Sequence, residues 1–165
     1  MLGPVSGAHM NPAVSVVAAL RRELGWRDAA LYALIQLGFG ILGAWAAHLM
    51  FDLPALQLSV KARCGLGQWT GEAIATFGLI LTIIGTVRHR PAAVPASVAL
   101  YIVAAYWFTS STSFANPAIT VARSLSNSFA GIAPADVPPF VLAQLAGALL
   151  AAAAGRFLFP SPDRR

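Results

Sequence analysis

The stretch SFANPAITVARS, residues 113–124, decides the fold of this chain, because SGAHMNPAVS at residues 6–15 repeats much of it. A shift of 105 residues (116 minus 11) places the triplet Asn11-Pro12-Ala13 on the triplet Asn116-Pro117-Ala118. Asparagine favours the cap position before a helix, and proline favours the first helical position because it has no N–H to lose there. The sequence therefore predicts two related helices, each starting directly after an asparagine.

The composition places these helices in a membrane protein. Hydrophobic residues make up 58% of the chain and charged residues only 10%, against about 25% charged in average soluble domains. The bases stand singly or in pairs, so the net charge of +5 indicates membrane topology and no nucleic-acid partner. Cys64 is the single cysteine, which excludes an intrachain disulfide and argues against a cysteine-based metal site. We expect no metal and no cofactor.

Four apolar stretches approach the roughly 20 residues that a helix needs to cross a bilayer. If residues 1–28 face the cytoplasm, eight of the eleven Lys and Arg side chains lie on the cytoplasmic side, as the positive-inside rule requires. We therefore expect one all-α membrane domain over residues 1–165. The expected transmembrane helices are 29–51, 69–87, 91–109 and 137–159.

The two segments that contain the asparagines, residues 6–20 and 111–126, are too short to cross a bilayer. They are apolar enough to enter one, and VSVVAAL at 14–20 lacks the polar face of a helix lying on the surface. We expect each to form a re-entrant loop with a half-helix, shielded by protein. Three expected spans separate them, so the second unit is inverted relative to the first, as in many transporters and channels.

Two half-helices that start at mid-membrane from opposite sides would bring their positive ends together. Such a site repels a cation and admits a neutral hydroxylic molecule. The side-chain amides of Asn11 and Asn116 could donate to a passing oxygen, and the carbonyls of residues 7–10 and 112–115 could accept from it.

The paired Asn-Pro-Ala (NPA) motifs, with SGAHMNPAV around the first, resemble those of the aquaporin or major intrinsic protein family over nearly the whole chain. The resemblance implies an aquaporin-like inverted-repeat helical bundle, usually a homotetramer in its full-length form. Each protomer would hold its own pore for water or small neutral solutes, in contact with membrane lipid. We expect a multi-pass protein of a cell membrane, such as a bacterial inner membrane. No catalytic cluster accompanies the motifs, so we expect no enzyme.

The sequence departs from the family pattern at its start. The family's bundle has six spans, two of them before the first NPA motif, whereas here the motif follows MLGPVSGAHM directly. We therefore expect an N-terminally truncated bundle that lacks the first two transmembrane helices. The alternative to a conducting channel is a non-conducting membrane fragment, either a truncated gene product or a packing subunit.

The expected selectivity filter also departs from the family. Most relatives carry an arginine directly after the second NPA motif, but here Ile119 stands there. By family position Ser113 and Ile119 are the two loop contributions, and a third lies within 101–105. Small Ser and apolar Ile predict a wider filter that passes glycerol, urea or undissociated metalloid hydroxides such as arsenite. The text STSFANPAITVARSL also resembles a bacterial subgroup associated with arsenic handling.

Three ionisable residues near the motifs have two interpretations each. Arg123 shares a helix face with Ile119 and could guard the outer mouth, or it could serve only as a topology or headgroup arginine. Glu72 could be a proton relay or ion ligand, whereas the family resemblance implies structural support of the second re-entrant loop. His9 could line the pore on the cytoplasmic side or gate it by pH, or it could pack within the loop.

Overall fold

The computed structural model describes residues 2–159, and all regular secondary structure in that range is helical. This confirms the predicted all-α fold. Four described helices are long and apolar enough to cross a membrane, and each overlaps one of the four expected stretches. They are α3 (Trp26–Met50), α4 (Leu66–His89), the run Pro91–Phe108 that ends in α5 (Val94–Phe108), and the run Pro134–Leu158 that ends in α7 (Val137–Leu158).

The chain divides into two compact units, which are described separately. The first unit contains the residues up to Cys64 together with Asn116–Val141, and the second contains Gly65–Ala115 together with the residues from Leu142 onward. The second NPA motif therefore starts at the boundary, with its asparagine in the first unit and the loop before it in the second.

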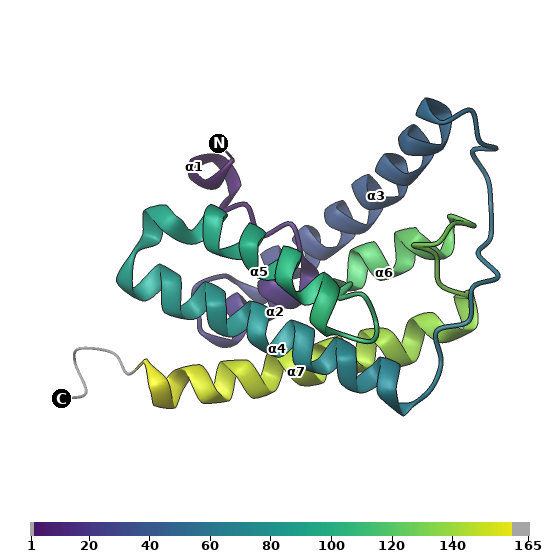
Figure 1. Ribbon diagram of the computed structural model, residues 1–165. Helices are drawn as coiled ribbons and strands as arrows, with labels where there is room; N and C mark the ends of the chain where they lie inside the picture. Colours follow the sequence, from purple (N-terminus) through teal and green to yellow (C-terminus); the bar gives the residue numbers. More distant parts are fainter. Residues whose placement is uncertain (1, 160–165) are drawn as a thin grey trace. The chain divides into compact units, whose positions relative to one another are not determined.

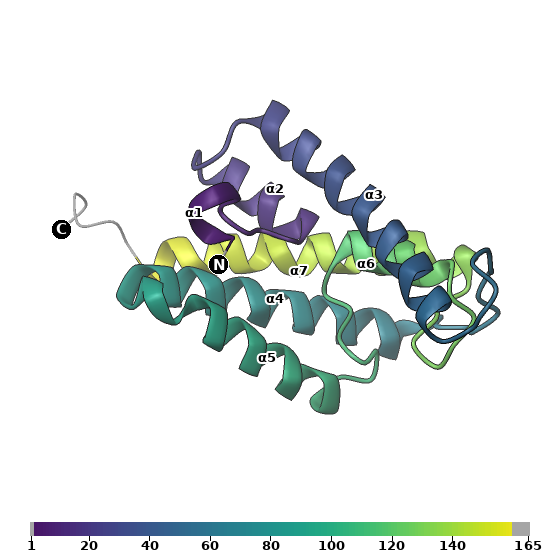
Figure 2. The same ribbon diagram turned by 90° about the horizontal axis from the view of Figure 1, so that it is seen from above.

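The first unit holds both short helices that follow the asparagines. These are α2 (Pro12–Leu20) and α6 (Pro117–Ser124), and both pack against the long helix α3. Figures 1 and 2 show α2 and α6 beside α3 in both views. Gly40 of α3 faces α6, and a Cβ there would lie in ordinary van der Waals contact with the Ala118 carbonyl oxygen, at 3.7 Å. One further turn of helix, α1 (Gly3–Ser6), precedes the first motif.

The second unit is built on the pair α4 and α5, which lie side by side (Figure 2). Its core is formed by Ala75, Leu79 and Ala115, with Tyr101 packed against them. The Tyr101 hydroxyl donates to the Ala75 carbonyl oxygen at 3.0 Å and so fixes α5 on α4.

The part of α7 that belongs to the second unit packs tightly on α4. A Cβ added to Gly147 would overlap the carbonyl group of Ala73, so only glycine allows this contact. Close helix approach through small residues is the usual packing mode where lipid offers no hydrophobic driving force between helices.

Candidate functional site

Both asparagines of the NPA motifs cap the helix that follows them. The Asn11 side-chain oxygen accepts from the backbone N–H of Ala13 at 2.9 Å. The Asn116 side-chain oxygen accepts from the backbone N–H groups of Ala118 at 3.0 Å and Ile119 at 3.3 Å. Pro12 and Pro117 occupy the first helical position in each case. The local sequence thus accounts for where both half-helices begin.

The loops before the two motifs repeat the same backbone pattern. We name them the first NPA loop, residues 7–10, and the second NPA loop, residues 110–115. Ala8 and Met10 have φ of 49° and 48°, and Ser113 and Ala115, 105 positions later, have φ of 50° and 47°. Left-handed backbone is uncommon for residues with a Cβ. Its occurrence at matching positions shows that the repeat extends to backbone geometry.

The start of α6 meets the first NPA loop within the first unit. The Asn116 side-chain amide donates to the Met10 carbonyl oxygen at 2.9 Å, directly before Asn11, and α2 contacts α6. The positive ends of the two half-helices therefore lie together. An amide NH2 has two hydrogens, so one hydrogen of Asn116 remains after the bond to Met10.

A pocket of about 540 Å³ opens beside this meeting point. Ile119 and His9 both line it, and most of its lining is apolar. Its other lining residues are Leu2, Ser6, Ala8, Met10, Tyr32, Ile35, Gln36, Phe39 and Gly40. A pocket that combines an apolar wall with a few polar groups suits a small uncharged molecule better than an ion.

His9 contacts two helices of the first unit, by a hydrogen bond to α2 and by a ring contact to α3. Its Nδ1 lies 3.1 Å from the hydroxyl of Ser15, which also accepts from the Gln36 side chain at 3.4 Å. Its ring lies 5.3 Å from the ring of Tyr32. Burial lowers the pKa of the His9 imidazole, although the nearby Glu23 carboxylate raises it in part. The neutral imidazole is therefore the favoured form in this loop.

Glu72 of α4 is fully buried and holds the second NPA loop. Its two carboxylate oxygens accept from the backbone N–H groups of Phe114 and Ala115, each at 2.8 Å. Gln144 of α7 donates to the same carboxylate at 2.5 Å. All three partners donate, so in these bonds the carboxylate acts only as an acceptor.

Ser113 lies in the middle of the second NPA loop. It is 3% exposed, and its backbone N–H donates to the Ser111 hydroxyl at 3.3 Å. Its own hydroxyl has no hydrogen-bond partner among the described residues. In the expected third filter segment, Ala105 is fully buried, whereas Val103 and Ala104 are exposed.

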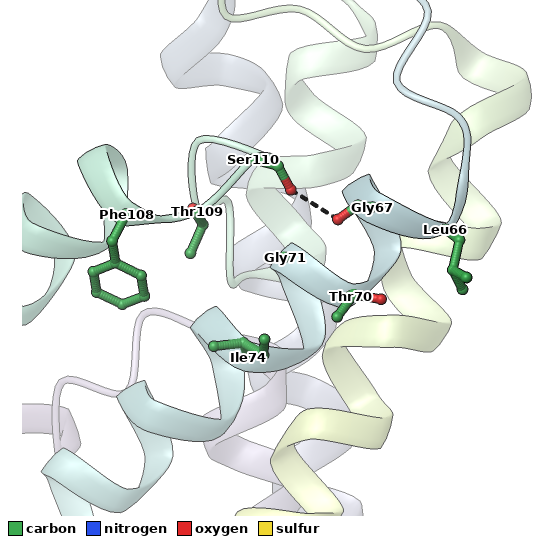
Figure 3. A pocket seen from close by; sticks show the side chains of 8 residues that line it. All are labelled: Leu66, Gly67, Thr70, Gly71, Ile74, Phe108, Thr109 and Ser110. Carbon is green, nitrogen blue, oxygen red and sulfur yellow. Dashed lines mark hydrogen bonds between the residues drawn. The ribbon is translucent and has the colours of Figure 1, made fainter.

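A second pocket, of about 520 Å³, lies where this loop meets the start of α4 (Figure 3). The Ser110 hydroxyl donates to the Gly67 carbonyl oxygen at 2.7 Å, and the Gln68 side chain donates to the Ser110 carbonyl oxygen at 2.8 Å. The loop is therefore attached to α4 at its beginning as well as at Glu72.

Arg123 and Arg63 both belong to the first unit. Arg123 is half-buried in the last turn of α6. Arg63 is 6% exposed, and its guanidinium donates to the carbonyl oxygens of Gly131 at 2.7 Å and Phe129 at 3.1 Å. Its backbone N–H also donates to the Asp136 carboxylate at 2.7 Å. Arg63 is one of the eleven Lys and Arg residues of the chain, and nothing in VKARCG indicates which loop its side chain contacts.

The described residues contain no group of three or more His, Cys, Asp or Glu side chains placed to hold a metal ion. The site contains oriented amides, carbonyls and helix ends. These groups can bind and release an uncharged hydroxylic molecule without reacting with it.

Comparisons with known proteins agree with this geometry. The sequence profile of the family described as Major intrinsic protein matches residues 1–115. Aquaglyceroporin AqpS of Rhizobium meliloti (strain 1021) is 55% identical over 158 residues, which cover 96% of this chain and 68% of that protein.

Two more distant relatives match with lower identity. The glycerol uptake facilitator protein of Bacillus subtilis (strain 168) is 33% identical over 52% of this chain and 32% of its own length. Aquaporin NIP1-1 of Oryza sativa subsp. japonica is 29% identical over 92% of this chain and 54% of its own length. The family profile and the similarity to AqpS lead to one conclusion, which confirms the predicted resemblance: this chain belongs to the major intrinsic protein family.

Proposed function

We propose that this chain forms a passive transmembrane channel for water and small uncharged solutes. The observation that carries the proposal is the hydrogen bond from the Asn116 amide to the Met10 carbonyl oxygen at 2.9 Å, because it brings the starts of α2 and α6 together. Relatives named as an aquaglyceroporin and a glycerol uptake facilitator support the same function. The matched region covers only 68% of the length of AqpS.

Electrostatics gives the proposed channel its preference for uncharged solutes. Each half-helix start carries the equivalent of roughly half a positive charge. Two such ends at one point oppose a cation that has already lost part of its hydration shell, whereas a neutral molecule gains hydrogen bonds. The remaining amide hydrogen of Asn116 can donate to the solute, and the carbonyls of the two NPA loops can accept from it.

The proposed filter residues suit solutes larger than water. Ile119 presents an apolar side chain to the 540 Å³ pocket at the position where most relatives carry arginine. Ser113, the other proposed filter residue, has a small side chain, and both residue types suit glycerol, urea or an undissociated metalloid hydroxide such as arsenite. Arg123 would face the outer mouth one turn of helix further along α6.

The remaining site residues have supporting roles in this proposal. Glu72 keeps the second NPA loop in place through the Phe114 and Ala115 amides, and His9 lines the cytoplasmic approach as a neutral group. We further propose that the channel assembles as a homotetramer in a bacterial inner membrane. Crosslinking in native membranes, followed by sizing, would test that assembly.

Reconstitution of the chain into liposomes tests the proposal. Stopped-flow swelling should give permeabilities to water, glycerol, urea and arsenite above those of empty liposomes, and planar bilayers should show no ionic current. If the inserted chain gives the permeability of empty liposomes, the non-conducting fragment is the correct alternative. Measurable ion conductance would contradict charge exclusion.

One substitution places a negative charge at the half-helix tip and also removes the donor of the bond to the Met10 carbonyl oxygen. Asn116→Asp keeps an N-cap of nearly equal preference, but it replaces a donor amide with a negative charge. We expect cation conductance to rise above background in this variant while the helix remains capped. The same near-zero conductance in both proteins would mean that the helix ends do not set ion exclusion.

A further inference from the structure

We propose that Gly71 of α4 is a positioning residue that sets the solute specificity of the channel. The absence of a side chain at this residue lets the second NPA loop lie directly on α4, and this contact fixes the place of Ser113. The inference rests on the proposed function, since the position of Ser113 affects selectivity only if solutes pass it.

The contact between Gly71 and the loop leaves no room for a side chain. A Cβ on Gly71 would lie 2.8 Å from the Ser110 hydroxyl oxygen and 3.2 Å from both the backbone nitrogen and the hydroxyl oxygen of Ser111. The Ser110 hydroxyl cannot rotate away freely, because it donates to the Gly67 carbonyl oxygen. Figure 3 shows Ser110 directed along α4 toward Gly67, with Gly71 one turn further along the helix. An added methyl group would therefore push the loop backbone away from α4.

Ser113 lies between two attachment points of this loop. Ser110 and Ser111 contact α4 at Gly71, and the backbone N–H groups of Phe114 and Ala115 bind Glu72 one residue further along the same helix. The Ser113 N–H donates to the Ser111 hydroxyl, so the two residues move together. If Ser110 and Ser111 move while the buried Glu72 carboxylate still holds the other end of the loop, Ser113 must shift.

The direction of the shift follows from burial on the α4 side of the loop. Glu72 and Ser111 are fully buried, so the space between loop and helix is already filled and the loop can move only away from α4. We take the solute path of the proposed channel to run on the side of Ser113 away from α4, and on that premise this movement narrows the path. A narrower opening slows glycerol more than water, because the larger molecule fills more of the opening.

The chain offers a matched control on the same helix. Gly67 lies one turn before Gly71 and lines the 520 Å³ pocket, and a Cβ there would meet nothing within 4 Å. Gly67→Ala and Gly71→Ala both replace a glycine of α4 with alanine. They differ in whether the new methyl group meets the loop.

The experiment measures the ratio of glycerol to water permeability in liposomes for wild type, Gly71→Ala and Gly67→Ala. We expect the ratio to fall by about threefold or more in Gly71→Ala and to stay at the wild-type value in Gly67→Ala. An unchanged ratio in a conducting Gly71→Ala protein overturns the inference and leaves the proposed function standing. Failure of the wild type to conduct overturns the proposed function instead.

Two further variants examine the same contact from the loop side. The double variant Gly71→Ala with Ser110→Ala removes the hydroxyl that the new methyl group meets and should recover part of the ratio, as contacting residues are expected to couple. Ser110→Thr enlarges the loop side and should lower the ratio even if Gly71→Ala does not reach the membrane. If Ser110→Thr keeps the wild-type ratio of glycerol to water permeability and the double variant recovers none of it, the contact between Gly71 and Ser110 does not set specificity.

Discussion

The two NPA loops share a sequence pattern and a backbone geometry, but they differ in what holds them. Phe114 and Ala115 of the second loop are 4% and 0% exposed and bind the carboxylate of Glu72. In the first loop Met10 is 59% exposed, and among the described residues no carboxylate accepts from residues 7–10.

The difference separates two requirements of a half-helix at membrane depth. The cap and the proline start the helix, and both repeats satisfy this requirement through their own sequence. The backbone before the cap also needs partners, since an unsatisfied polar group in lipid costs several kcal/mol. In the second NPA loop, Glu72 of the neighbouring helix α4 supplies these partners. The two loops therefore repeat in sequence but not in the contacts that support them.

The largest expected effect is the loss of the carboxylate that supports the second loop. Glu72→Ala leaves two backbone N–H groups and the Gln144 amide without their buried acceptor, at a cost on the order of 3–5 kcal/mol. This is a large part of the usual 5–15 kcal/mol of folding stability. We expect the thermal midpoint in detergent to fall sharply and solute permeability to drop to the level of empty liposomes.

A matched change in the first loop makes this prediction a comparison. His9→Ala removes one contact to the Ser15 hydroxyl, and we expect a loss of only about 0.5–1.5 kcal/mol. Equal losses of stability in Glu72→Ala and His9→Ala would mean that the two loops are supported alike, contrary to their hydrogen bonds.

The sequence could predict the features that depend on local signals. Span length, apolar composition and the Asn-Pro start of a helix are all written in neighbouring residues, which is why α3 and both half-helix starts could be predicted. The roles of the NPA and filter side chains in permeation stay predictions.

The sequence could not reveal contacts between residues that are distant in the chain. The Gly71 contact depends on Ser110, and the Arg63 bonds depend on Phe129 and Gly131. A single glycine or arginine between apolar stretches fits several roles, so its sequence neighbours do not identify its contact. The register of 101–105 also needed three-dimensional information, since Tyr101 and Ala105 face protein whereas Val103 and Ala104 do not.

The second-largest effect concerns the residue after each NPA triplet, which is Val14 in the first repeat and Ile119 in the second. Ile119→Arg adds a long charged side chain to the 540 Å³ pocket. We expect permeability to glycerol and arsenite to fall by about tenfold and permeability to water by a smaller factor, as a pocket narrowed by one side chain rejects the larger solute first.

The control for this prediction is Ile119→Val. Valine is the residue that follows the first NPA triplet, at Val14. This substitution removes one methylene group and keeps the wall apolar, so both permeabilities should stay close to wild type. If Ile119→Arg lowers water and glycerol permeability equally, residue 119 does not select by size.

A smaller effect is expected from Arg63, which holds the loop after α6 through the carbonyl oxygens of Gly131 and Phe129. Arg63→Lys keeps the charge but loses the planar fork that reaches the carbonyl oxygens of Gly131 and Phe129. We expect a loss of about 1–3 kcal/mol, read as a lower thermal midpoint and faster proteolysis of residues 125–136. Lys61→Gln removes an exposed charge two residues away and should change neither.

The smallest expected effect is the response of the first loop to pH. Burial lowers the pKa of His9 from its usual 6.5, so the unfolded chain takes up a proton before the folded chain does. The contribution of His9 to stability is therefore complete above about pH 6.5 and declines as the pH falls below that value. Permeability to glycerol should stay constant between about pH 8 and pH 6.5, and a decrease below that range should be absent in His9→Ala. A change in glycerol permeability above pH 6.5 that persists in His9→Ala would assign the pH response to another group outside the first NPA loop.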